Sequence, residues 1–234
     1  MVKTRLEIPE PLPIEWIRKP VSGAKSGMEI LADGRLRCWI EHDIVKGVTP
    51  AMLAWWFKNL EGDVEIDGVP HNRYRVWHPV DHLFAEYARR GPDGTVGVGS
   101  VIHLAEMLNG RPEYLVHIYT EIKKLDETGY IHEPRIHGLR LARMDYEFET
   151  VEGGTRYVNS LTFGIEGRLG KLLNPLVRRF FFDEERGRAW IRHNVEEVGN
   201  FEFFLPDLYE RENSVKTKRT LPFQTRSVSL TAIV

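Results

Sequence analysis

Hydrophobic positions recur at helical spacing in the last third of the chain. One face of the expected helix carries five residues that lie three or four positions apart, namely Trp190, His193, Glu197, Phe201 and Phe204. A histidine and a glutamate one turn apart are unusual on a face that is otherwise aromatic. Because a buried carboxylate is costly unless something pairs with it, this pair indicates half of a metal site.

The limits of this helix follow from the prolines. Asn174 is a good helix cap, Pro175 suits the first helical position, and no further proline occurs before Pro206. The pattern therefore predicts one helix of about eight turns over residues 174–204. Glu196 precedes Glu197 directly, so one of these two glutamates is expected to face outward.

Earlier segments predict strands and one short helix. Residues 34–44 alternate between apolar and polar positions and predict a strand. Thr49 and Pro50 repeat the signal of a cap followed by proline, which predicts a short helix over residues 50–60. Residues 74–78 are predicted as a strand that Pro79 ends, with Asp81 and His82 in the turn or first helical turn that follows.

The middle of the chain is typical of a sheet. Residues 91–100 are rich in glycine but lack the Gly-Lys-Ser/Thr sequence of a phosphate-binding loop. Residues 129–150 and 156–167 predict two long strands joined by a tight hairpin at 151–155. The tail over residues 226–234 also alternates and is expected to close a sheet edge.

Many strands followed by one long helix predict an α+β domain in which a curved antiparallel sheet surrounds a long C-terminal helix. Residues 1–27 are rich in proline and are expected to form an extended N-terminal arm, and residues 28–234 a single domain. A cavity between sheet and helix would be the place for a functional site.

Composition narrows the class of protein. A chain of 234 residues with 42% hydrophobic and 28% charged residues is typical of a globular protein, and its net charge of −2 gives no general attraction to nucleic acid or an anionic membrane. Its single cysteine, Cys38, excludes an internal disulfide and is expected to be a buried structural thiol. With neither a signal-peptide core nor an apolar run of membrane-spanning length, we expect a cytoplasmic protein.

The rest of a metal site has several candidates. A zinc-like site needs three or four nitrogen, oxygen or sulfur ligands from separate elements. His78 and His82 are the first and last residues of a His-Pro-Val-Asp-His sequence, and Glu106 lies in an otherwise apolar segment. Each also has a structural explanation, since His78 would suit a strand end and Asp81 a helix cap. No Gly-x-Ser-x-Gly, His-Glu-x-x-His, Walker A or dinucleotide motif competes with this interpretation.

Four blocks of sequence carry a resemblance to a known family. They are WWF at 55–57, RYxxWHPxDH at 73–82, SVIHLAEMLNG at 100–110 and GRAWIRHNVEEVGNFEFFLP at 187–206. In this order they resemble the 2,4-diacetylphloroglucinol (DAPG) hydrolase and phloretin hydrolase family. The resemblance implies a Bet v 1-like helix-grip fold, with residues 28–234 as its catalytic domain. It also implies hydrolysis of a C–C bond between a phloroglucinol-type ring and an acyl group.

The resemblance further implies one zinc ion per chain, held by two histidines and two glutamates. The implied metal ligands are His82, Glu106, His193 and Glu197, with His78 as the alternative to His82. Tyr74 and His137 are the expected catalytic residues, because a general acid must protonate the ring carbon. Tyr157 and Trp190 are expected to bind the substrate.

Three functions are therefore considered. The leading hypothesis is a metal-dependent hydrolase that cleaves a C–C bond next to a carbonyl group in an acylated phenolic compound. The alternative from another class is a helix-grip carrier that binds an aromatic or lipid-like ligand without converting it. A third is a metal-dependent cyclase or decarboxylase of the same fold. We expect a small aromatic ketone as partner, no nucleic acid and no membrane, and leave open a homo-oligomer, the acyl chain, and zinc against iron or manganese.

Overall fold

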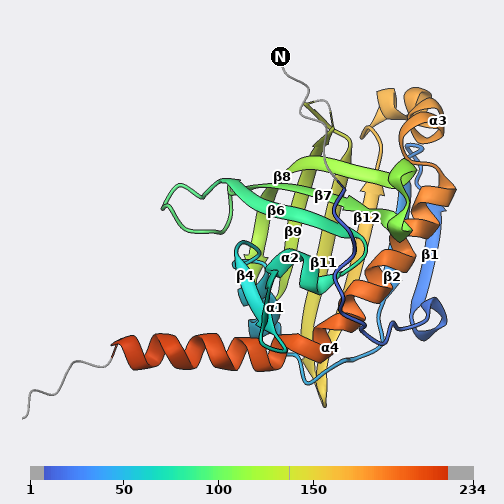
Figure 1. Ribbon diagram of the computed structural model, residues 1–234. Helices are drawn as coiled ribbons and strands as arrows, with labels where there is room; N and C mark the ends of the chain where they lie inside the picture. Colours follow the sequence, from blue (N-terminus) through green and yellow to red (C-terminus); the bar gives the residue numbers. More distant parts are fainter. Residues whose placement is uncertain (1–7, 137, 221–234) are drawn as a thin grey trace, which may run out of the picture.

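The computed structural model describes residues 8–136 and 138–220, and its centre is a helix held by a curved antiparallel sheet (Figure 1). The strands are β1 (Lys25–Ile30), β2 (Leu36–Glu41), β3 (Val45–Lys46), β4 (Asp63–Ile66), β5 (Val69–Asn72), β6 (His82–Arg89), β7 (Val101–Met107), β8 (Leu115–Asp126), β9 (Gly129–Ile136), β10 (Leu139–Arg140), β11 (Ala142–Val151) and β12 (Gly154–Phe163). The helices are α1 (Pro50–Trp56), α2 (Arg73–Trp77), α3 (Arg168–Phe181) and α4 (Glu184–Thr220), with 3₁₀ turns η1 (Val21–Gly23), η2 (Leu108–Gly110) and η3 (Pro112–Tyr114).

The main sheet has the strand order β1-β2-β12-β11-β9-β8-β7-β6, and each of these neighbours pairs antiparallel. Short strands β3 and β10 add to β12 and β9, and β4 pairs with β5 in a separate ribbon. The sheet curves so that its concave face holds α4 (Figure 1). The predicted α+β helix-grip fold is therefore confirmed.

Several local predictions hold. The strand predicted over residues 34–44 is β2, and residues 91–100 form a loop. Helix α1 begins after Thr49, whose hydroxyl accepts a hydrogen bond from the Met52 N–H at 3.3 Å. Cys38 is fully buried, and burial raises the pKa of its thiol to about 12, as expected of a structural residue.

The strand prediction for residues 129–150 is correct only in part. The chain reverses between Ile136 and Leu139, which pair with each other, so that β9, β10 and β11 replace one long strand. Gly138 has a φ of 80°, which glycine adopts without strain. The hairpin between β11 and β12 is present as predicted. The tail at 226–234 lies outside the described residues.

The prediction of a single helix over residues 174–204 is wrong at both ends. The chain breaks at Phe182 and Asp183, and the Asp183 carboxylate accepts a hydrogen bond at 2.9 Å from the Arg186 N–H at the start of α4. Asn174 lies inside α3 and caps nothing. Its buried side chain instead accepts from the Ile165 N–H at 2.8 Å and donates to the Asp33 carbonyl at 2.7 Å.

Helix α4 also continues through Pro206 to Thr220 and is bent in Figure 1. A proline inside a helix lacks an N–H and crowds the preceding turn, which explains a bend without a break. None of the helices in the described part of the chain is both long and apolar enough to cross a membrane.

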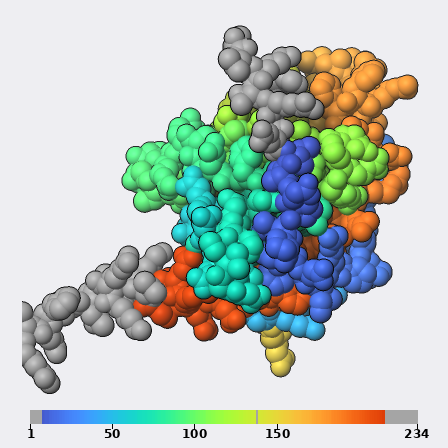
Figure 2. Space-filling model, in the orientation of Figure 1, coloured from blue at the N-terminus to red at the C-terminus, as the bar shows by residue number. Residues whose placement is uncertain are grey.

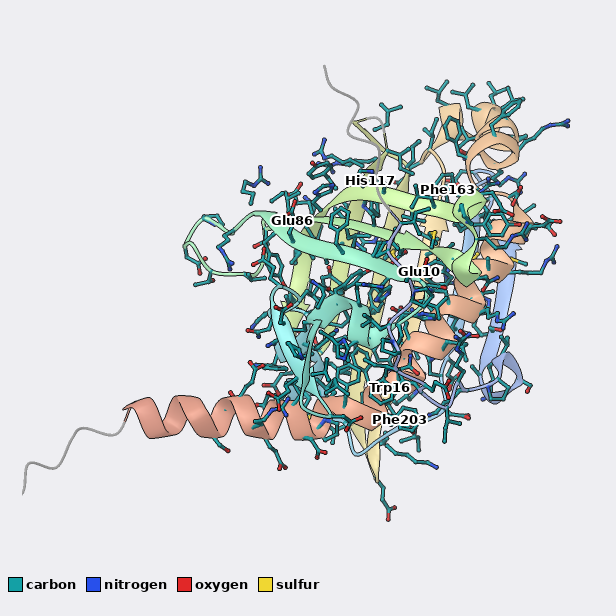
Figure 3. The ribbon with its side chains drawn as sticks, viewed as in Figure 1. Glu10, Trp16, Glu86, His117, Phe163 and Phe203 are labelled. Carbon is teal, nitrogen blue, oxygen red and sulfur yellow. The ribbon has the colours of Figure 1, made fainter. Side chains whose placement is uncertain are left out.

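The N-terminal arm covers the side of α4 that the sheet leaves open, and it crosses the surface in Figure 2. Trp16 stacks on Phe203 of α4 with ring centroids 5.6 Å apart, and its Nε1 donates to the Val76 carbonyl of α2 at 2.7 Å (Figure 3). Lys19 pairs with Glu202 at 2.5 Å. Sheet and arm together bury α4 on nearly all sides between residues 189 and 205. Strand β1 already begins at Lys25.

We predict that Asn174→Ala lowers the free energy of unfolding by about 2–3 kcal/mol, because it leaves buried backbone groups of the neighbouring loop without partners. A simple helix cap would cost about 1 kcal/mol. Urea unfolding measures the difference. Lys171→Ala, at an exposed position of the same helix, serves as the control and should stay within about 0.5 kcal/mol of the parent.

Candidate metal centre

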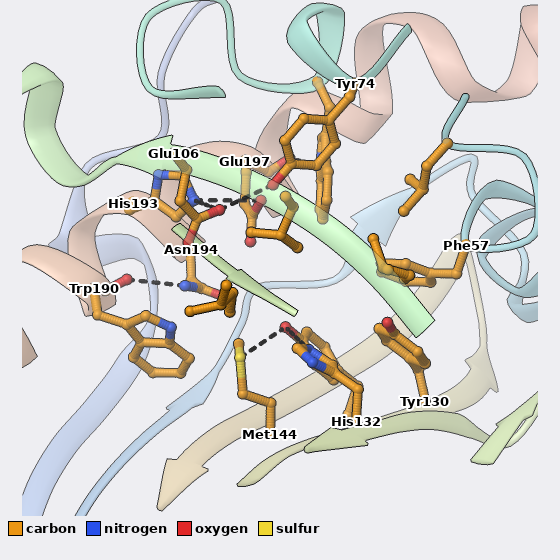
Figure 4. Close-up of a pocket in the computed structure, with 16 residues that line it drawn as sticks. Phe57, Tyr74, Glu106, Tyr130, His132, Met144, Trp190, His193, Asn194 and Glu197 are labelled. Carbon is orange, nitrogen blue, oxygen red and sulfur yellow. Dashed lines mark hydrogen bonds and ion pairs between the residues drawn. The ribbon is translucent and has the colours of Figure 1, made fainter. Parts of the chain in front are cut away.

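Four side chains from three elements converge at one end of the space between sheet and α4, and Figure 4 shows three of them, Glu106, His193 and Glu197. The Nε2 atom of His82 lies 3.3 Å from Oε2 of Glu197 and 3.8 Å from Oε2 of Glu106. The Nε2 atom of His193 lies 3.6 Å and 3.8 Å from the same two oxygens. The structure therefore brings together the four residues that the family resemblance implied as metal ligands.

Local structure explains this convergence. His82 opens β6 and Glu106 lies on β7, and the two residues are direct partners in the antiparallel register. Side chains alternate along a strand, so Ile102, Leu104 and Glu106 all line the cavity. On α4, His193 and Glu197 lie one turn apart on the face predicted from their spacing.

The two imidazoles are oriented by hydrogen bonds at their other nitrogen. Nδ1 of His82 lies 2.9 Å from the carbonyl oxygen of Tyr74. A carbonyl can only accept, so Nδ1 carries the proton and Nε2 keeps its lone pair. Among the described residues this buried Nε2 has no hydrogen-bond partner. An unpartnered lone pair aimed at two carboxylates is the arrangement that a metal ion would complete.

His193 is held by a carboxylate. Its Nδ1 lies 2.8 Å from Oδ2 of Asp81, a buried residue that also accepts hydrogen bonds from the N–H groups of Asn109 at 2.8 Å and Gly110 at 2.7 Å. Burial acts to raise the pKa of Asp81, but these contacts, led by His193, lower it below its usual value. Carboxylate–histidine–metal arrangements of this kind fix the ligand and strengthen its basicity.

The carboxylates of the cluster require a compensating positive charge. Burial acts to raise the pKa of Glu197, yet His193 and His82 lower it to about 2. Burial acts to lower the pKa of His193, yet the carboxylates of Glu197, Asp81 and Glu106 raise it well above its usual value. In the absence of a metal, a proton on His193 therefore supplies the positive charge.

The donor set fits a divalent ion of the size of zinc. Ligand atoms of a tetrahedral zinc site lie about 2.1 Å from the ion and therefore about 3.4 Å from each other. The four nitrogen–oxygen distances here are 3.3, 3.6, 3.8 and 3.8 Å. Ligand atoms of His82, His193 and Glu197 all lie within 4.8 Å of one another, and Glu106 lies at the margin of this group. Two imidazoles and two carboxylates also suit iron or manganese, so the donors do not select among these metals.

His78, the alternative ligand, packs against the His193 ring. Its ion-pair contacts are with Asp81 and Glu196 instead of Glu106 and Glu197. Its Nδ1 accepts a hydrogen bond from the Asp81 N–H at 3.1 Å, which leaves the proton on Nε2, 3.3 Å from Glu196. Its ring stacks on that of His193 at 4.8 Å. His78, Asp81 and His193 form a second group with the spacing of metal ligands. In this group His193 and Asp81 are already hydrogen-bonded to each other.

Two local predictions around the cluster are wrong. Glu196 is buried like its neighbour, because the arm covers it and Arg18 and Arg192 approach its carboxylate at 3.5 and 2.9 Å. The strand predicted over residues 74–78 is instead helix α2 over residues 73–77, since Asn72 caps the helix by accepting from the Arg75 N–H at 3.2 Å.

Tyr74 links the cluster of His82, Glu106, His193 and Glu197 to the cavity. Its ring stacks on His82 at 3.9 Å, and its hydroxyl donates to Oε2 of Glu106 at 2.9 Å. Burial and the nearby carboxylates raise the pKa of Tyr74 well above its usual value. Tyr74 is therefore a neutral hydrogen-bond donor beside the cluster.

The inner cavity next to these residues has a volume of about 50 Å³, and Figure 4 shows its lining. Trp190, an expected substrate-binding residue, lines it. Tyr157 does not, because it is fully buried in the core against the edge of His42, 5.2 Å away. His137 lies outside the described residues. Of the aromatic cluster at 55–57, only Phe57 reaches the cavity.

Sequence reasoning missed four polar residues that line this cavity, namely Tyr130, His132, Tyr146 and Asn194. Tyr130 and His132 share a face of β9, and Tyr146 of β11 is the direct register partner of Tyr130. Burial lowers the pKa of His132 to about 3, so its ring is neutral near pH 7. The alternation of side chains along β9 could have indicated this face. The sequence of either strand alone, however, does not reveal the register that pairs β9 with β11.

Comparison with known proteins gives one family match. Residues 15–124 match the family model described as the DAPG hydrolase PhiG domain, a segment that contains Tyr74, His82 and Glu106. No curated protein sequence matches the chain.

Solved structures with a similar arrangement are distant in sequence. Ara h 8.0201 is 17% identical, with a TM-score of 0.37 over 74% of this chain and 98% of its own. A START superfamily protein from Mycobacterium smegmatis is 10% identical, with a TM-score of 0.39 over 70% of this chain and 97% of its own. The fold assignment rests on the strand order and on α4.

We predict that the protein purified without added metal carries about one equivalent of zinc, and that His193→Ala and His82→Gln lose it while remaining folded. His78→Gln, at the histidine placed behind the cluster, should retain the metal. Elemental analysis with circular dichroism measures both properties. If His78→Gln loses the metal while His82→Gln keeps it, the assignment of the first ligand is reversed.

We also predict that Asp81→Asn weakens metal affinity about 10–100-fold without abolishing it, because an amide cannot balance the charge of an imidazole that binds a cation. Competition with a chromogenic chelator measures the affinity. Unchanged affinity would show that Asp81 serves only the backbone of η2.

Proposed function

From the match of residues 15–124 to the DAPG hydrolase family model, we propose that the chain is a zinc-dependent hydrolase that cleaves the C–C bond between an acyl group and an electron-rich phenolic ring. The observation that carries this proposal is the convergence of two imidazole nitrogens and two carboxylates at one end of an aromatic cavity. Nothing about the packing of the core requires such a cluster, since buried carboxylates are costly.

The reaction balances with water as the only co-substrate. The oxygen of water bonds to the carbonyl carbon, and the bond between that carbon and the ring breaks with its electron pair left on the ring. The ring carbon then takes up a proton, so that the products are a carboxylic acid and the deacylated phenol. A divalent ion bound at the cluster would supply Lewis acidity for a carbonyl oxygen or lower the pKa of a water molecule.

The protein groups around the cavity have distinct tasks in this proposal. Tyr74 offers a hydroxyl that is protonated at neutral pH, and it is our candidate for the group that donates to the substrate and protonates the ring. His132 is held neutral by burial, and its Nε2, 3.5 Å from the Tyr146 hydroxyl, is placed to bond a phenolic hydroxyl as donor or acceptor. The proposed catalytic role of His137 stays a prediction.

The walls of the inner cavity suit a phenolic ring. Phe57, Trp77 and Trp190 supply aromatic surface, and offset stacking or edge contacts with a ring are favourable. Tyr130, Tyr146 and Asn194 supply hydroxyl and amide groups that can bond ring hydroxyls. Ring hydroxyls would add to the hydrogen bonds that Tyr146 already makes with His132 and that Asn194 already makes with Asn159.

A non-catalytic carrier of aromatic or lipid-like ligands is the competing function. A carrier needs an enclosed apolar cavity but has no need for Glu106 and Glu197 at one point beside two histidines. The cluster therefore favours the enzyme over the carrier.

We predict that the protein releases a carboxylic acid and the deacylated phenol from acylphloroglucinols, which liquid chromatography can quantify. Tyr74→Phe should lower kcat about 10²–10⁴-fold, because it removes the proton donor. Tyr119→Phe, the same change at an exposed tyrosine on the outer face of β8, should leave the rate unchanged.

Metal content is measured on the same samples so that a lost ligand is not mistaken for a lost acid. If acylphloroglucinols bind but are not turned over by the zinc-loaded protein, the carrier function replaces the hydrolase. Full activity of Tyr74→Phe would assign the acid to another residue.

A further inference from the structure

A second cavity adjoins the inner one. Four residues line both, namely Glu106, Ile118, Met144 and Trp190, so these side chains form a shared wall. The outer cavity has a volume of about 220 Å³ and is larger than the inner one, which has about 50 Å³. It lies between the sheet and the junction of α3 and α4, and it reaches His117 and Phe163, both labelled in Figure 3.

The outer cavity differs in chemistry from the inner one. Its depth is lined by hydrocarbon side chains of which Leu108, Leu161, Phe163 and Phe182 are buried. Its few polar residues include His117, which is exposed, and Arg186, which lies over the ring of Tyr114 at the surface. The inner cavity, by contrast, carries tyrosine, histidine and asparagine side chains along its walls.

Glu106 places the boundary between the two cavities at the proposed metal site. It belongs to the metal cluster and to both cavities, so the cluster lies where the two meet. A ketone carbon at the cluster carries two substituents that diverge from one trigonal centre. One substituent then lies in each cavity, and the polar groups of the inner cavity select the hydroxylated ring.

We propose that the outer cavity binds the acyl chain, and that the preferred substrates are phenols bearing a long apolar acyl group instead of an acetyl group. This inference rests on the proposed hydrolase for its substrate class. Each methylene that leaves water for an apolar environment tightens binding about fourfold. The area of apolar wall available therefore favours chains of several carbons over the shortest one.

The test is a series of monoacylphloroglucinols with acyl chains of increasing length, together with matching alkylphloroglucinols that lack the carbonyl and cannot be hydrolysed. We expect kcat/KM for the ketones and affinity for the alkyl compounds to rise about two- to fourfold per methylene until the cavity is filled. Calorimetry or tryptophan fluorescence measures binding without any need for turnover.

Two variants localise the effect. Ala142→Leu fills part of the outer cavity and should remove the rise in kcat/KM and affinity with chain length. Arg143→Leu, the next residue of the same strand on its outer face, is the matched control and should keep the full dependence on chain length. Ile136→Ala, which removes apolar wall at a half-buried position, should weaken long-chain binding several-fold.

The outcomes separate the two proposals. Hydrolysis without any dependence on chain length overturns the acyl cavity and leaves the hydrolase intact. Binding that depends on chain length, without hydrolysis of any ketone by zinc-loaded protein, supports the cavity and overturns the hydrolase. A chain-length dependence that Ala142→Leu and Arg143→Leu affect equally would place the chain elsewhere and also overturn the inference.

Discussion

Negative charge concentrated beside α4 is the constraint on which the surrounding structure depends. Asp81 and Glu197 are buried and Glu106 lies at the cavity edge, all three within ion-pair distance of His193. Buried carboxylates persist only when each has hydrogen bonds and a compensating charge. The backbone of η2 turns its N–H groups to Asp81, and α2 turns a carbonyl to His82. Elements far apart in sequence are thus arranged around one electrostatic requirement.

The same requirement explains why α4 is enclosed from two sides. The sheet supplies His82 and Glu106, but a helix resting on a sheet alone would leave its opposite face in water. The arm closes that face, and Arg18 reaches Glu196, whose partner His78 stacks on His193. A layer of charged and aromatic contacts therefore stands between solvent and the cluster, which keeps the local dielectric low and the interactions strong.

The sequence predicted which residues share a face within one helix or strand. It did not predict the contacts and strand registers between elements. The spacing of His193 and Glu197 reports a helical face directly, and Thr49 with Pro50 marks the start of α1. Asn174 and Pro175 gave the same local signal, yet tertiary contacts with the neighbouring loop determine the role of Asn174.

The cavity lining shows the same limit. Tyr130 and Tyr146 face each other only because of a register set by the whole sheet, and Glu196 is buried only because the arm covers it. The family resemblance supplied what periodicity could not, since it placed ligands from β6, β7 and α4 in one site. Its expectation for Tyr157 shows that a loosely matched segment does not transfer residue by residue.

The pairing of a strand-borne histidine and glutamate with a helix-borne pair has a thermodynamic consequence. An ion held by all four would tie the β6–β7 hairpin to a helix about a hundred residues later, and so would act as a reversible crosslink across about half of the chain. Such a ligand binds the native state alone, and at a hundredfold excess over its Kd it adds about 2.7 kcal/mol to stability. The cellular supply of the metal would then govern how long the protein survives as well as how fast it works.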